Sequence, residues 1–516
     1  MRLFPMNFVQ ARLRLVQAGA VFATGALIAG CGNNYRAVVT PITGTGPAAE
    51  TTSYVVAVST PAANADGIAT MIDYSGDSIM ATAPIGPDPL NFTLDETGST
   101  GYTVNSDGTL TNIPFSTTRL QSQYITNSTI SKTSNLIGLF APSSGLWATD
   151  LSTNSIDIFS SSPATLKMSL PVAAVPTMVI GPGTGGQRYY AISQVADSNG
   201  TDCNTNPSGV TSTGFATPIE LAYETADTPI AVGKCPVFAV PSSDGKRLYV
   251  LNRGSDTITV INMVSGALDS CTPFYNQANA LVTCHPTLPL SLNGVANNNS
   301  VAPPNGTSGM TQTAGPVFAE FNAATQQLIV SNYDGGTISI INVSLDEYGN
   351  DANTYDSKGN ITGGFGTTYT VAVGNKPAAV SVLYDGSYAY AANQADGTVS
   401  VVNLSSHSLE KTLTVVGNPR SIVSTQNSET AKVYVSSPNS DYITVIDAET
   451  KQVLTTILTS GNLVDIRTTS QNGNSGNDND NSRRPGFGQP CFMPDTTATK
   501  YSASLATCEQ IPYSGT

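Results

Sequence analysis

A sixteen-residue segment that occurs four times with variation, the repeated phrase, constrains the fold of this chain more than any other sequence feature. It reads "RLYVLNRGSDTITVIN" from Arg247, and it returns as "QLIVSNYDGGTISIIN" from Gln327, "YAYAANQADGTVSVVN" from Tyr388 and "KVYVSSPNSDYITVID" from Lys432. Each copy consists of two apolar stretches around a polar turn, which predicts a pair of antiparallel strands. An internal repeat of this kind indicates that the chain stacks or circles copies of one small unit.

The unit is longer than the phrase and is apolar on both faces. Upstream of each phrase lie a Pro, another apolar stretch and a turn such as Asp244-Gly245, and a fourth apolar stretch follows, such as Leu409 to Gly417. In the strand after Arg247, Leu248 and Val250 face one side while Tyr249 and Leu251 face the other. A four-stranded sheet with two apolar faces must be covered on both sides. The sequence therefore predicts an all-β chain in which such sheets form the blades of a β-propeller.

The spacing of the units leaves two blade counts open. Three strands within Ser53 to Ile85 lack an inner strand, and "NLVDIRTTS", from Asn462 to Ser470, is available to complete that sheet and close the ring. This count predicts eight blades. The first strands of the other seven units begin near Pro89, Asn135, Pro176, Pro236, Pro316, Pro377 and Pro419.

The units resemble a known propeller family. The string Tyr102-Thr103-Val104-Asn105, in the unit that starts at Pro89, and the "TITVIN" and "YITVID" strands are similar to the YVTN repeats of lactonase-like and surface-layer propellers. The resemblance covers roughly residues 53–470. It implies a β-propeller, favours seven blades, and leaves the activity open because propellers host many functions.

The first thirty residues differ from the rest. They combine Arg2, Arg12 and Arg14 with an apolar run over residues 15–30, a pattern typical of a secretion signal. The run ends in Ile28-Ala29-Gly30-Cys31, which resembles the lipobox of bacterial lipoproteins. We expect a signal peptide over 1–30, a lipid on Cys31 and a flexible tether over 31–52, at the bacterial cell envelope. The absence of Asp at position 32 favours the outer membrane. An ordinary signal peptide with an incidental Cys is the alternative.

Six further cysteines are consistent with export, and an even number predicts disulfides. Pairing of sequence neighbours is the simplest of fifteen possibilities. It joins Cys203 to Cys235, Cys271 to Cys284, and Cys491 to Cys508. Cys203 lies in a polar insertion over residues 194–214, Cys271 and Cys284 lie in a second over 266–314, and a third insertion spans 344–366. We interpret residues 471–516 as a disordered linker with a possible disulfide clasp.

The sequence gives little support for catalysis, metal binding or nucleic-acid binding. The chain has two His, and neither His285 nor His407 lies in a recognisable triad, so we assign no catalytic residue. The Asp- and Asn-rich stretches 346–360 and 477–481 do not carry the Gly and the terminal Glu at the positions of an EF-hand loop, and we predict no metal or cofactor. A net charge of −14 argues against nucleic acid as a partner.

One rim of the propeller is the best candidate for a ligand site. The loops that join the second strand to the third, and one blade to the next, lie on the same face of a propeller. These loops contain Lys234, Arg253, Tyr333, Lys376, Gln394, Arg420 and Asn439. We predict a positive arc there for an anionic or polar ligand. The alternative is that the cations only solubilise the rim.

The sequence thus supports two functions from different classes. The first is a lipid-anchored extracytoplasmic propeller that binds a protein, a glycan or a small anionic ligand, or serves as a scaffold, without chemistry. The alternative is a lactonase-like hydrolase of a cyclic ester, which requires titratable groups with shifted pKa values at the rim.

Overall fold

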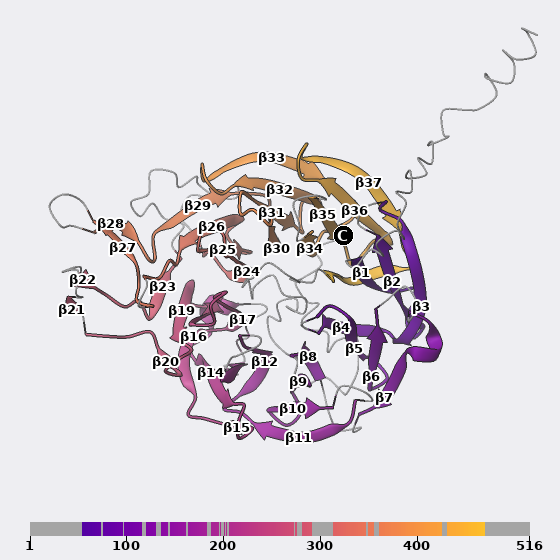
Figure 1. Cartoon of the computed structure of the whole chain (residues 1–516), viewed down its shortest axis with the longest axis horizontal. Coiled ribbons are helices and arrows are strands. Elements are labelled where there is room, and N and C mark those ends of the chain that lie inside the picture. The colour runs from indigo at the N-terminus through magenta and orange to yellow at the C-terminus, as the bar shows by residue number, and fades with distance from the viewer. Residues whose placement is uncertain are drawn as a thin grey trace, which may run out of the picture. The chain divides into compact units, whose positions relative to one another are not determined.

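The structure is a computed structural model that describes residues 54–469, apart from short stretches at 74–75, 96, 116–119, 131–135, 143–144, 161–163, 183–186, 196, 198–200, 202, 204–205, 273, 276–280, 291–312, 347–348, 356–360 and 426–430. In this part of the chain, eight sheets of four or five strands stand around one axis (Figure 1). The fold is an eight-bladed β-propeller, which confirms the all-β prediction. The seven blades favoured by the family resemblance are wrong, because the N-terminal strands form a complete blade with the last strand.

Blade 1 closes the ring from both ends of the described chain. From the axis outward it consists of β38 (Asn462–Thr468), β1 (Tyr54–Thr60), β2 (Asp66–Asp73) and β3 (Ile79–Pro87). The strands β1 and β38 pair antiparallel from Val55↔Thr468 to Thr60↔Asn462. This pairing is the closure that the "NLVDIRTTS" stretch predicts.

Blades 2 to 4 follow in chain order. Blade 2 consists of β4 (Pro89–Leu94), β5 (Thr100–Asn105), β6 (Thr109–Pro114) and β7 (Thr126–Thr129), with the short helix η1 (Ser122–Tyr124) before its last strand. Blade 3 consists of β8 (Leu136–Phe140), β9 (Leu146–Asp150), β10 (Ser155–Phe159) and β11 (Leu166–Pro171). Blade 4 consists of β12 (Val175–Ile180), β13 (Arg188–Gln194), β14 (Thr213–Glu220), β15 (Thr225–Ala226) and β16 (Ile230–Lys234), with η2 (Pro207–Gly209) before β14.

Blades 5 to 8 contain the four copies of the repeated phrase as their second and third strands. Blade 5 consists of β17 (Pro236–Pro241), β18 (Arg247–Asn252), β19 (Thr257–Asn262), β20 (Ala267–Leu268) and β23 (Thr287–Pro289). Blade 6 consists of β24 (Pro316–Asn322), β25 (Gln327–Asn332), β26 (Thr337–Asn342) and β29 (Thr368–Ala372). Blade 7 consists of β30 (Pro377–Val382), β31 (Tyr388–Asn393), β32 (Thr398–Asn403) and β33 (Ser408–Thr414), and blade 8 of β34 (Ser421–Ser424), β35 (Lys432–Ser436), β36 (Tyr442–Asp447) and β37 (Gln452–Leu458).

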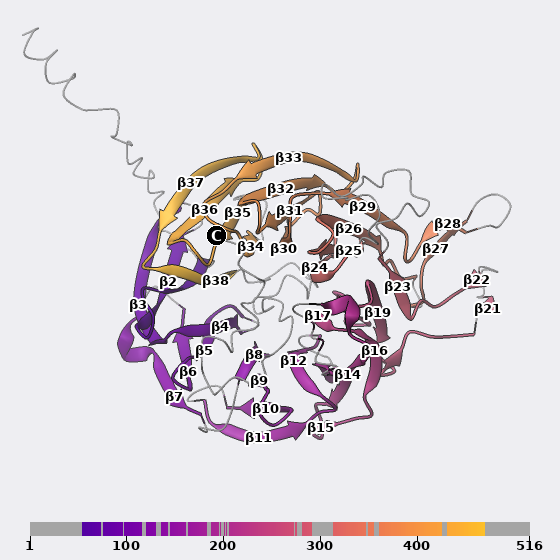
Figure 2. The ribbon, with the colours of Figure 1, turned by 180° about the vertical axis from the view of Figure 1, so that it is seen from behind.

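Two small hairpins lie beyond the outer strands of blades 5 and 6. They are β21 (Phe274–Tyr275) with β22 (Leu281–Val282), and β27 (Asn353–Tyr355) with β28 (Ile361–Gly364). Both views of the ring place them together on one side of it (Figures 1 and 2). They belong to the second and third predicted insertions, so these insertions contain short strands as well as loops.

Three of the four copies of the repeated phrase end their second strand with an Asn that has a structural role. The side-chain amide of Asn252 donates to Thr257 at 3.2 Å and to Thr259 at 2.9 Å. Asn332 and Asn393 make the same pair of hydrogen bonds to residues five and seven positions later. The recurring Asn therefore ties the second strand to the third across the turn, and its role is structural.

The core lies between the blades, as the two-faced strands require. Leu248, Tyr249, Val250 and Leu251 are all fully buried, and the same pattern holds in the other copies. At the ring closure, the ammonium of Lys432 contacts both carboxylate oxygens of Asp77 at 2.9 Å, and the hydroxyl of Tyr434 donates to Asp77 at 2.7 Å. These bonds join blade 8 to blade 1 in addition to the β1–β38 pairing.

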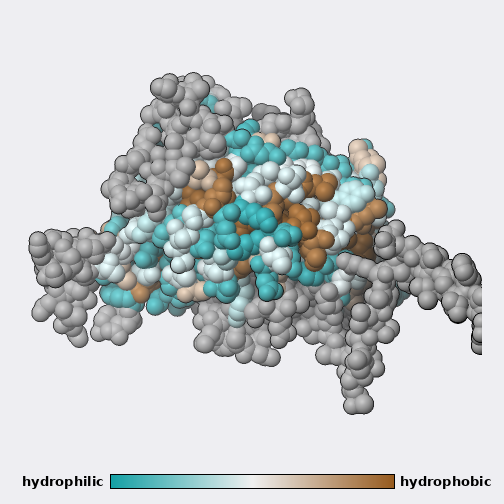
Figure 3. All heavy atoms as spheres, turned by 90° about the horizontal axis from the view of Figure 1, so that it is seen from above, coloured by the Kyte–Doolittle hydropathy of each residue, from teal (hydrophilic) through white to brown (hydrophobic). Residues whose placement is uncertain are grey.

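The outer wall of the ring is mixed in character. Figure 3 views the side that carries β33 and β37, where apolar and polar patches alternate. Leu409, Leu454 and Leu458 of these outer strands are exposed. None of the helices among the described residues has the length and apolar character needed to cross a membrane.

Candidate functional site

In blades 5, 6 and 7, the two predicted rim loops of each blade contact each other through the backbone. The turn after each second strand bonds to the residue before the inner strand of its own blade: the backbone N–H of Arg253 donates to Cys235, that of Tyr333 to Gly315, and that of Gln394 to Lys376, at 2.9–3.0 Å. Lys376 has a φ of 53°, in the left-handed region that side chains rarely adopt. The backbone at this rim is therefore tightly determined.

Four of the predicted residues form one group around an aromatic ring, which we call the Tyr333 cluster. The guanidinium carbon of Arg253 lies 5.6 Å from the ring centroid of Tyr333, and the ammonium of Lys376 lies 5.8 Å from it. The hydroxyl of Tyr333 donates to the side chain of Gln394 at 3.2 Å. Burial raises the pKa of Tyr333 far above its usual value, so the hydroxyl stays protonated. The cluster comprises Arg253, Tyr333, Lys376 and Gln394, from blades 5, 6 and 7.

The positive charges of the rim are not equivalent. Arg253 is nearly buried, bonds Asp334 through two nitrogens at 2.9 and 2.8 Å, and donates to the carbonyl of Cys203 at 3.0 Å. Its charge is therefore neutralised within the protein. Among the described residues, the ion pairs include no acidic partner for Lys234 or Lys376. The local positive charge comes from these two lysines.

The remaining predicted rim residues lie beside this cluster. The side chain of Arg420 is buried and donates to the carbonyl of Val464 at 3.2 Å, at the junction of blades 8 and 1. Asn439 accepts the backbone N–H of Asn418, and the amide of Asn418 donates to the carbonyl of Gln394 at 2.8 Å. Arg420 and Asn439 are thus tied to the scaffold of blade 8, whereas Lys376 is tied to Tyr333.

One titratable rim group escaped the sequence analysis. Asp256, in the turn after β18, accepts the backbone N–H of Gly315 at 2.7 Å. Burial, opposed by that hydrogen bond and reinforced by the nearby Asp334, raises its pKa from 3.8 to about 6. A carboxyl group with this pKa changes charge close to neutral pH. Its position in the turn gave no signal, because Asp is common in all such turns.

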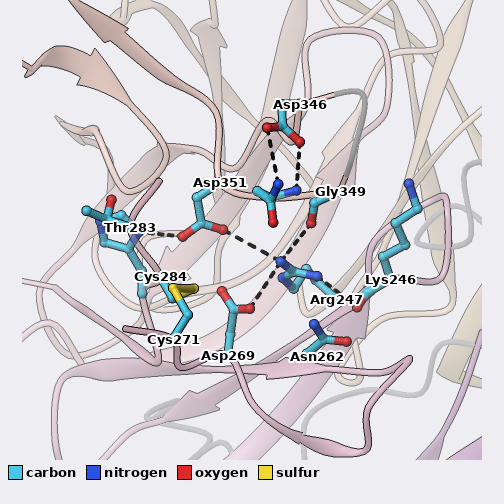
Figure 4. Close-up of polar contacts among 12 residues, drawn as sticks. Lys246, Arg247, Asn262, Asp269, Cys271, Thr283, Cys284, Asp346, Gly349 and Asp351 are labelled. Atoms are coloured by element: carbon cyan, nitrogen blue, oxygen red, sulfur yellow. Dashed lines mark hydrogen bonds and ion pairs between the residues drawn. A yellow bond between two sulfur atoms is a disulfide. The ribbon is translucent and has the colours of Figure 1, made fainter. Parts of the chain in front are cut away.

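A second polar cluster, the insertion joint, lies where the insertions of blades 5 and 6 meet (Figure 4). Arg247 contacts Asp269 at 3.1 Å and Asp351 at 3.8 Å, and it donates to the carbonyl of Gly349 at 3.0 Å. Nδ1 of His285 lies 2.5 Å from Asp351. Burial, and then the charge of Asp351, raise the pKa of Asp269. The sequence analysis left His285 without a partner and missed this joint, because no motif relates residues from two insertions.

Neither the other histidine nor the described part of the 346–360 stretch forms a comparable site. His407 stacks on Tyr369 with ring centroids 3.7 Å apart, and burial lowers its pKa. Asp346 bonds Asn350 within a turn of the 346–360 stretch. The described residues contain no group of three or more His, Cys, Asp or Glu placed to hold a metal ion. The stretch 477–481 lies outside the described residues.

The structure confirms two of the three predicted disulfides. Cys203 is joined to Cys235, and Cys271 to Cys284. Disulfides persist in oxidising compartments, which indicates a location outside the cytosol. Cys31, Cys491 and Cys508 lie outside the described residues.

Comparisons with known proteins support the fold and no more. No protein-family model matches the chain, and no curated protein matches it. Among solved structures, apo AztD from Citrobacter koseri is 14% identical, with a TM-score of 0.50 over 82% of this chain and 99% of that one. A proposed 6-phosphogluconolactonase from Bacteroides fragilis is 14% identical, with a TM-score of 0.45 over 82% and 99%. Hydrazine synthase from Kuenenia stuttgartiensis is 13% identical, with a TM-score of 0.41 over 70% and 96%.

Proposed function

We propose that this chain is a lipid-anchored, extracytoplasmic β-propeller that binds a small anionic ligand at the Tyr333 cluster and carries out no chemistry. The observation behind the proposal is Lys376. Its ammonium lies 5.8 Å from the centroid of the Tyr333 ring, and no ion pair among the described residues neutralises it. An ammonium has three donors, and a ring face satisfies none of them as a hydrogen-bond acceptor would. An anion seated beside Lys376 supplies the missing acceptors.

The negative net charge of the protein sets a requirement for any anion-binding site on it. A chain with a net charge of −14 repels anions over most of its surface. A site for an anion must therefore concentrate cations that other acids do not neutralise. Lys234, on the loop next to Arg253, provides a second such charge at the same rim.

The rim proposal is tested by ligand-induced stabilisation. Inorganic phosphate and citrate are the probes, and we expect each to raise the Tm of the wild-type protein in a concentration-dependent way. Lys376→Gln should remove the shift, as should the charge reversal Lys376→Glu. The matched control is Lys411→Gln on the outer strand β33, which should keep it. A shift that survives Lys376→Gln, or no shift with either probe, contradicts the proposal.

The lipid anchor rests on the residues around Cys31 and needs its own test. Mass spectrometry of the protein from a bacterial host should find a lipid-modified N-terminal Cys31. Cys31→Ser should leave an unlipidated precursor. A chain cleaved elsewhere, without modification, contradicts this part of the proposal and leaves the rim proposal standing.

The hydrolase alternative is favoured by one observation, the raised pKa of Asp256. A carboxylate that takes up protons near pH 6 at the rim suits a general base for opening a cyclic ester. Glucono-δ-lactone is the test substrate. Catalysed hydrolysis by the wild type that Asp256→Asn lowers by about 100-fold or more would favour the hydrolase. Equal rates for both proteins favour the binding module.

A further inference from the structure

The outer edge of blade 5 is built from two short strands instead of one. β20 pairs with β19 at Ile261↔Leu268, and β23 pairs with the same strand from Thr257↔Pro289 to Thr259↔Thr287. Between them the chain leaves the blade and returns. The Cys271–Cys284 disulfide joins the outgoing and the returning chain across a sequence separation of 13. This bridge therefore sits at the base of the insertion, where the two halves of the outer edge meet.

The residues next to the bridge also make the contacts to the insertion of blade 6. Asp269, two residues before Cys271, contacts Arg247 at 3.1 Å. Thr283, directly before Cys284, accepts the side-chain amide of Asn353 at 3.2 Å. His285, directly after Cys284, contacts Asp351 at 2.5 Å and stacks on Phe365 with ring centroids 5.3 Å apart. The bridge and the insertion joint thus depend on the same few residues (Figure 4).

The joint tolerates little displacement because its charges are buried. The side chain of Asp351 is fully buried, and those of Arg247 and Asp269 are 4% and 3% exposed. The two buried carboxylates share the guanidinium of Arg247, and Asp351 also contacts the ring of His285. Burial raises the pKa of the nearby Tyr249, so its hydroxyl stays neutral. Buried charges are stable only while their partners stay in place.

The bridge differs from its surroundings in being open to solvent. Cys271 is exposed and Cys284 is half-buried. In contrast, Cys203 and Cys235 are 1% and 2% exposed. Attack on a disulfide requires that a thiolate reach one sulfur atom, so exposed bridges exchange more readily than buried ones.

We propose that Cys271–Cys284 is a thiol–disulfide exchange site whose redox state sets whether the insertions of blades 5 and 6 are docked. The reductant is a dithiol. One of its thiolates attacks a sulfur atom of the bridge and displaces the other cysteine as a thiolate. Its second thiol then displaces the first cysteine and closes a disulfide on the reductant. Two electrons and two protons pass to Cys271 and Cys284, which become thiols.

Reduction loosens the joint because the outgoing and returning chain are no longer held together. Asp269, Thr283 and His285 then lose their fixed positions opposite Arg247, Asn353 and Asp351. The carboxylate of Asp351 gains solvation only if the insertion of blade 6 moves away. The coupling is reciprocal, so an undocked insertion must also make the bridge easier to reduce.

The first experiment follows both bridges in the full-length protein. Dithiothreitol is added under native conditions, free thiols are trapped with N-ethylmaleimide, and peptides are analysed by mass spectrometry. We expect Cys271 and Cys284 to be labelled about tenfold or more faster than Cys203 and Cys235, because the latter require local unfolding. Hydrogen exchange of residues 349–355 and 361–366 should speed up on reduction, while blade 7 stays protected. Equal labelling rates, or unchanged exchange in the blade 6 insertion, overturn the proposal.

The second experiment tests the reciprocal effect. Asp351→Asn undocks the joint without touching the bridge, and we expect its Cys271–Cys284 bridge to be reduced about fivefold or more faster than in the wild type. The control is Asp385→Asn, in a turn of blade 7, which should leave the rate unchanged. An Asp351→Asn protein that folds and keeps the wild-type rate overturns the coupling. If that variant does not fold, the wild-type labelling and exchange decide the proposal alone.

Discussion

The two disulfides of the described chain use the same chemistry at opposite places in the blade. The Cys203–Cys235 bridge lies at the rim, where Cys235 directly precedes the inner strand of blade 5 and the carbonyl of Cys203 accepts from Arg253. The Cys271–Cys284 bridge lies at the outer edge of the same blade. The first is buried at the rim and fixes the carbonyl that Arg253 of the Tyr333 cluster contacts. The second faces water and holds two insertions together.

This difference shows that position in the blade decides what a cross-link does. Near the axis every element is in contact with two neighbouring blades, so a bridge there stabilises the ring as a whole. At the outer edge a segment is able to open without disturbing the core, so a bridge there controls a local equilibrium. We therefore expect the Cys203–Cys235 bridge to affect the stability of the whole ring and the Cys271–Cys284 bridge to affect only local opening of the outer edge.

The largest effect is expected when the arginine beside each bridge is removed. Arg247→Ala leaves Asp269 and Asp351 buried without a cation, which should cost about 3–5 kcal/mol of unfolding free energy. Arg253→Ala should cost less, because Asp334 is 25% exposed and is partly solvated once unpaired. Urea unfolding of both variants measures the difference. A larger loss for Arg253→Ala would reverse the comparison.

The next effect comes from removing each bridge in turn. Cys203→Ala with Cys235→Ala should lower the unfolding free energy by about 4 kcal/mol, as expected for a loop of this length. Cys271→Ala with Cys284→Ala should lower it by about 1 kcal/mol, because its loop opens locally before the ring unfolds. Urea unfolding of the unreduced variants tests this order. Equal losses would mean that the outer insertion is part of the cooperative core.

A smaller effect concerns the pH dependence of the rim. Because the pKa of Asp256 is raised to about 6 in the folded protein, the folded state binds more protons than the unfolded state between its usual value of 3.8 and about 6. The contribution of Asp256 to stability is therefore present at acidic pH and is lost as the pH rises through about 6. Asp256→Asn should show a flatter profile in thermal unfolding over this range. An unchanged profile would show that Asp256 titrates normally.

The smallest effect concerns a contact between the outer edges of blades 6 and 7 that lies outside the insertion joint. His407, in the turn before β33, stacks on Tyr369 of blade 6 and has a φ of 53°. His407→Asn keeps a residue that tolerates this backbone conformation and removes the ring, so it should cost about 1 kcal/mol or less. Urea unfolding gives the value. A loss as large as that of Arg247→Ala would mean that regular outer edges are as strongly coupled as the insertion joint.

Much of the scaffold follows from short-range patterns. The repeated phrase and the Asn that ends the second strand of blades 5 to 7 depend on residues a few positions apart. The closing strand near Asn462 was identified by counting strands, although its partner β1 lies at the other end of the described chain. Two disulfide pairs follow from the simplest neighbour pairing. The count of eight blades follows from counting strands, and the family resemblance misled because repeat similarity does not constrain how many units close a ring.

The Tyr333 cluster and the insertion joint could be predicted only in part from short-range sequence patterns. The rim loops were located because every blade places its turns on the same face. The bond from Arg253 to Asp334 joins residues 81 positions apart, and the contact of His285 with Asp351 spans 66 positions. No periodic pattern connects such pairs. The sequence analysis therefore predicted an arc of cations at the rim without naming an acidic partner for any of them, whereas the structure pairs Arg253 with Asp334 and buries Arg420.

The amino-acid sequence by itself determined the propeller, its ring closure and the pairing of Cys203–Cys235 and Cys271–Cys284. Strand alternation, turns and neighbouring cysteines depend on short stretches of chain. The ring closure joins distant residues, but it could be predicted because one unit lacked an inner strand and one strand near Asn462 was left over. Only the tertiary structure decided which charges are neutralised, which disulfide is exposed and which insertions meet. These properties depend on the path of irregular loops between blades, where a displacement of a few ångströms separates a buried ion pair from two solvated side chains.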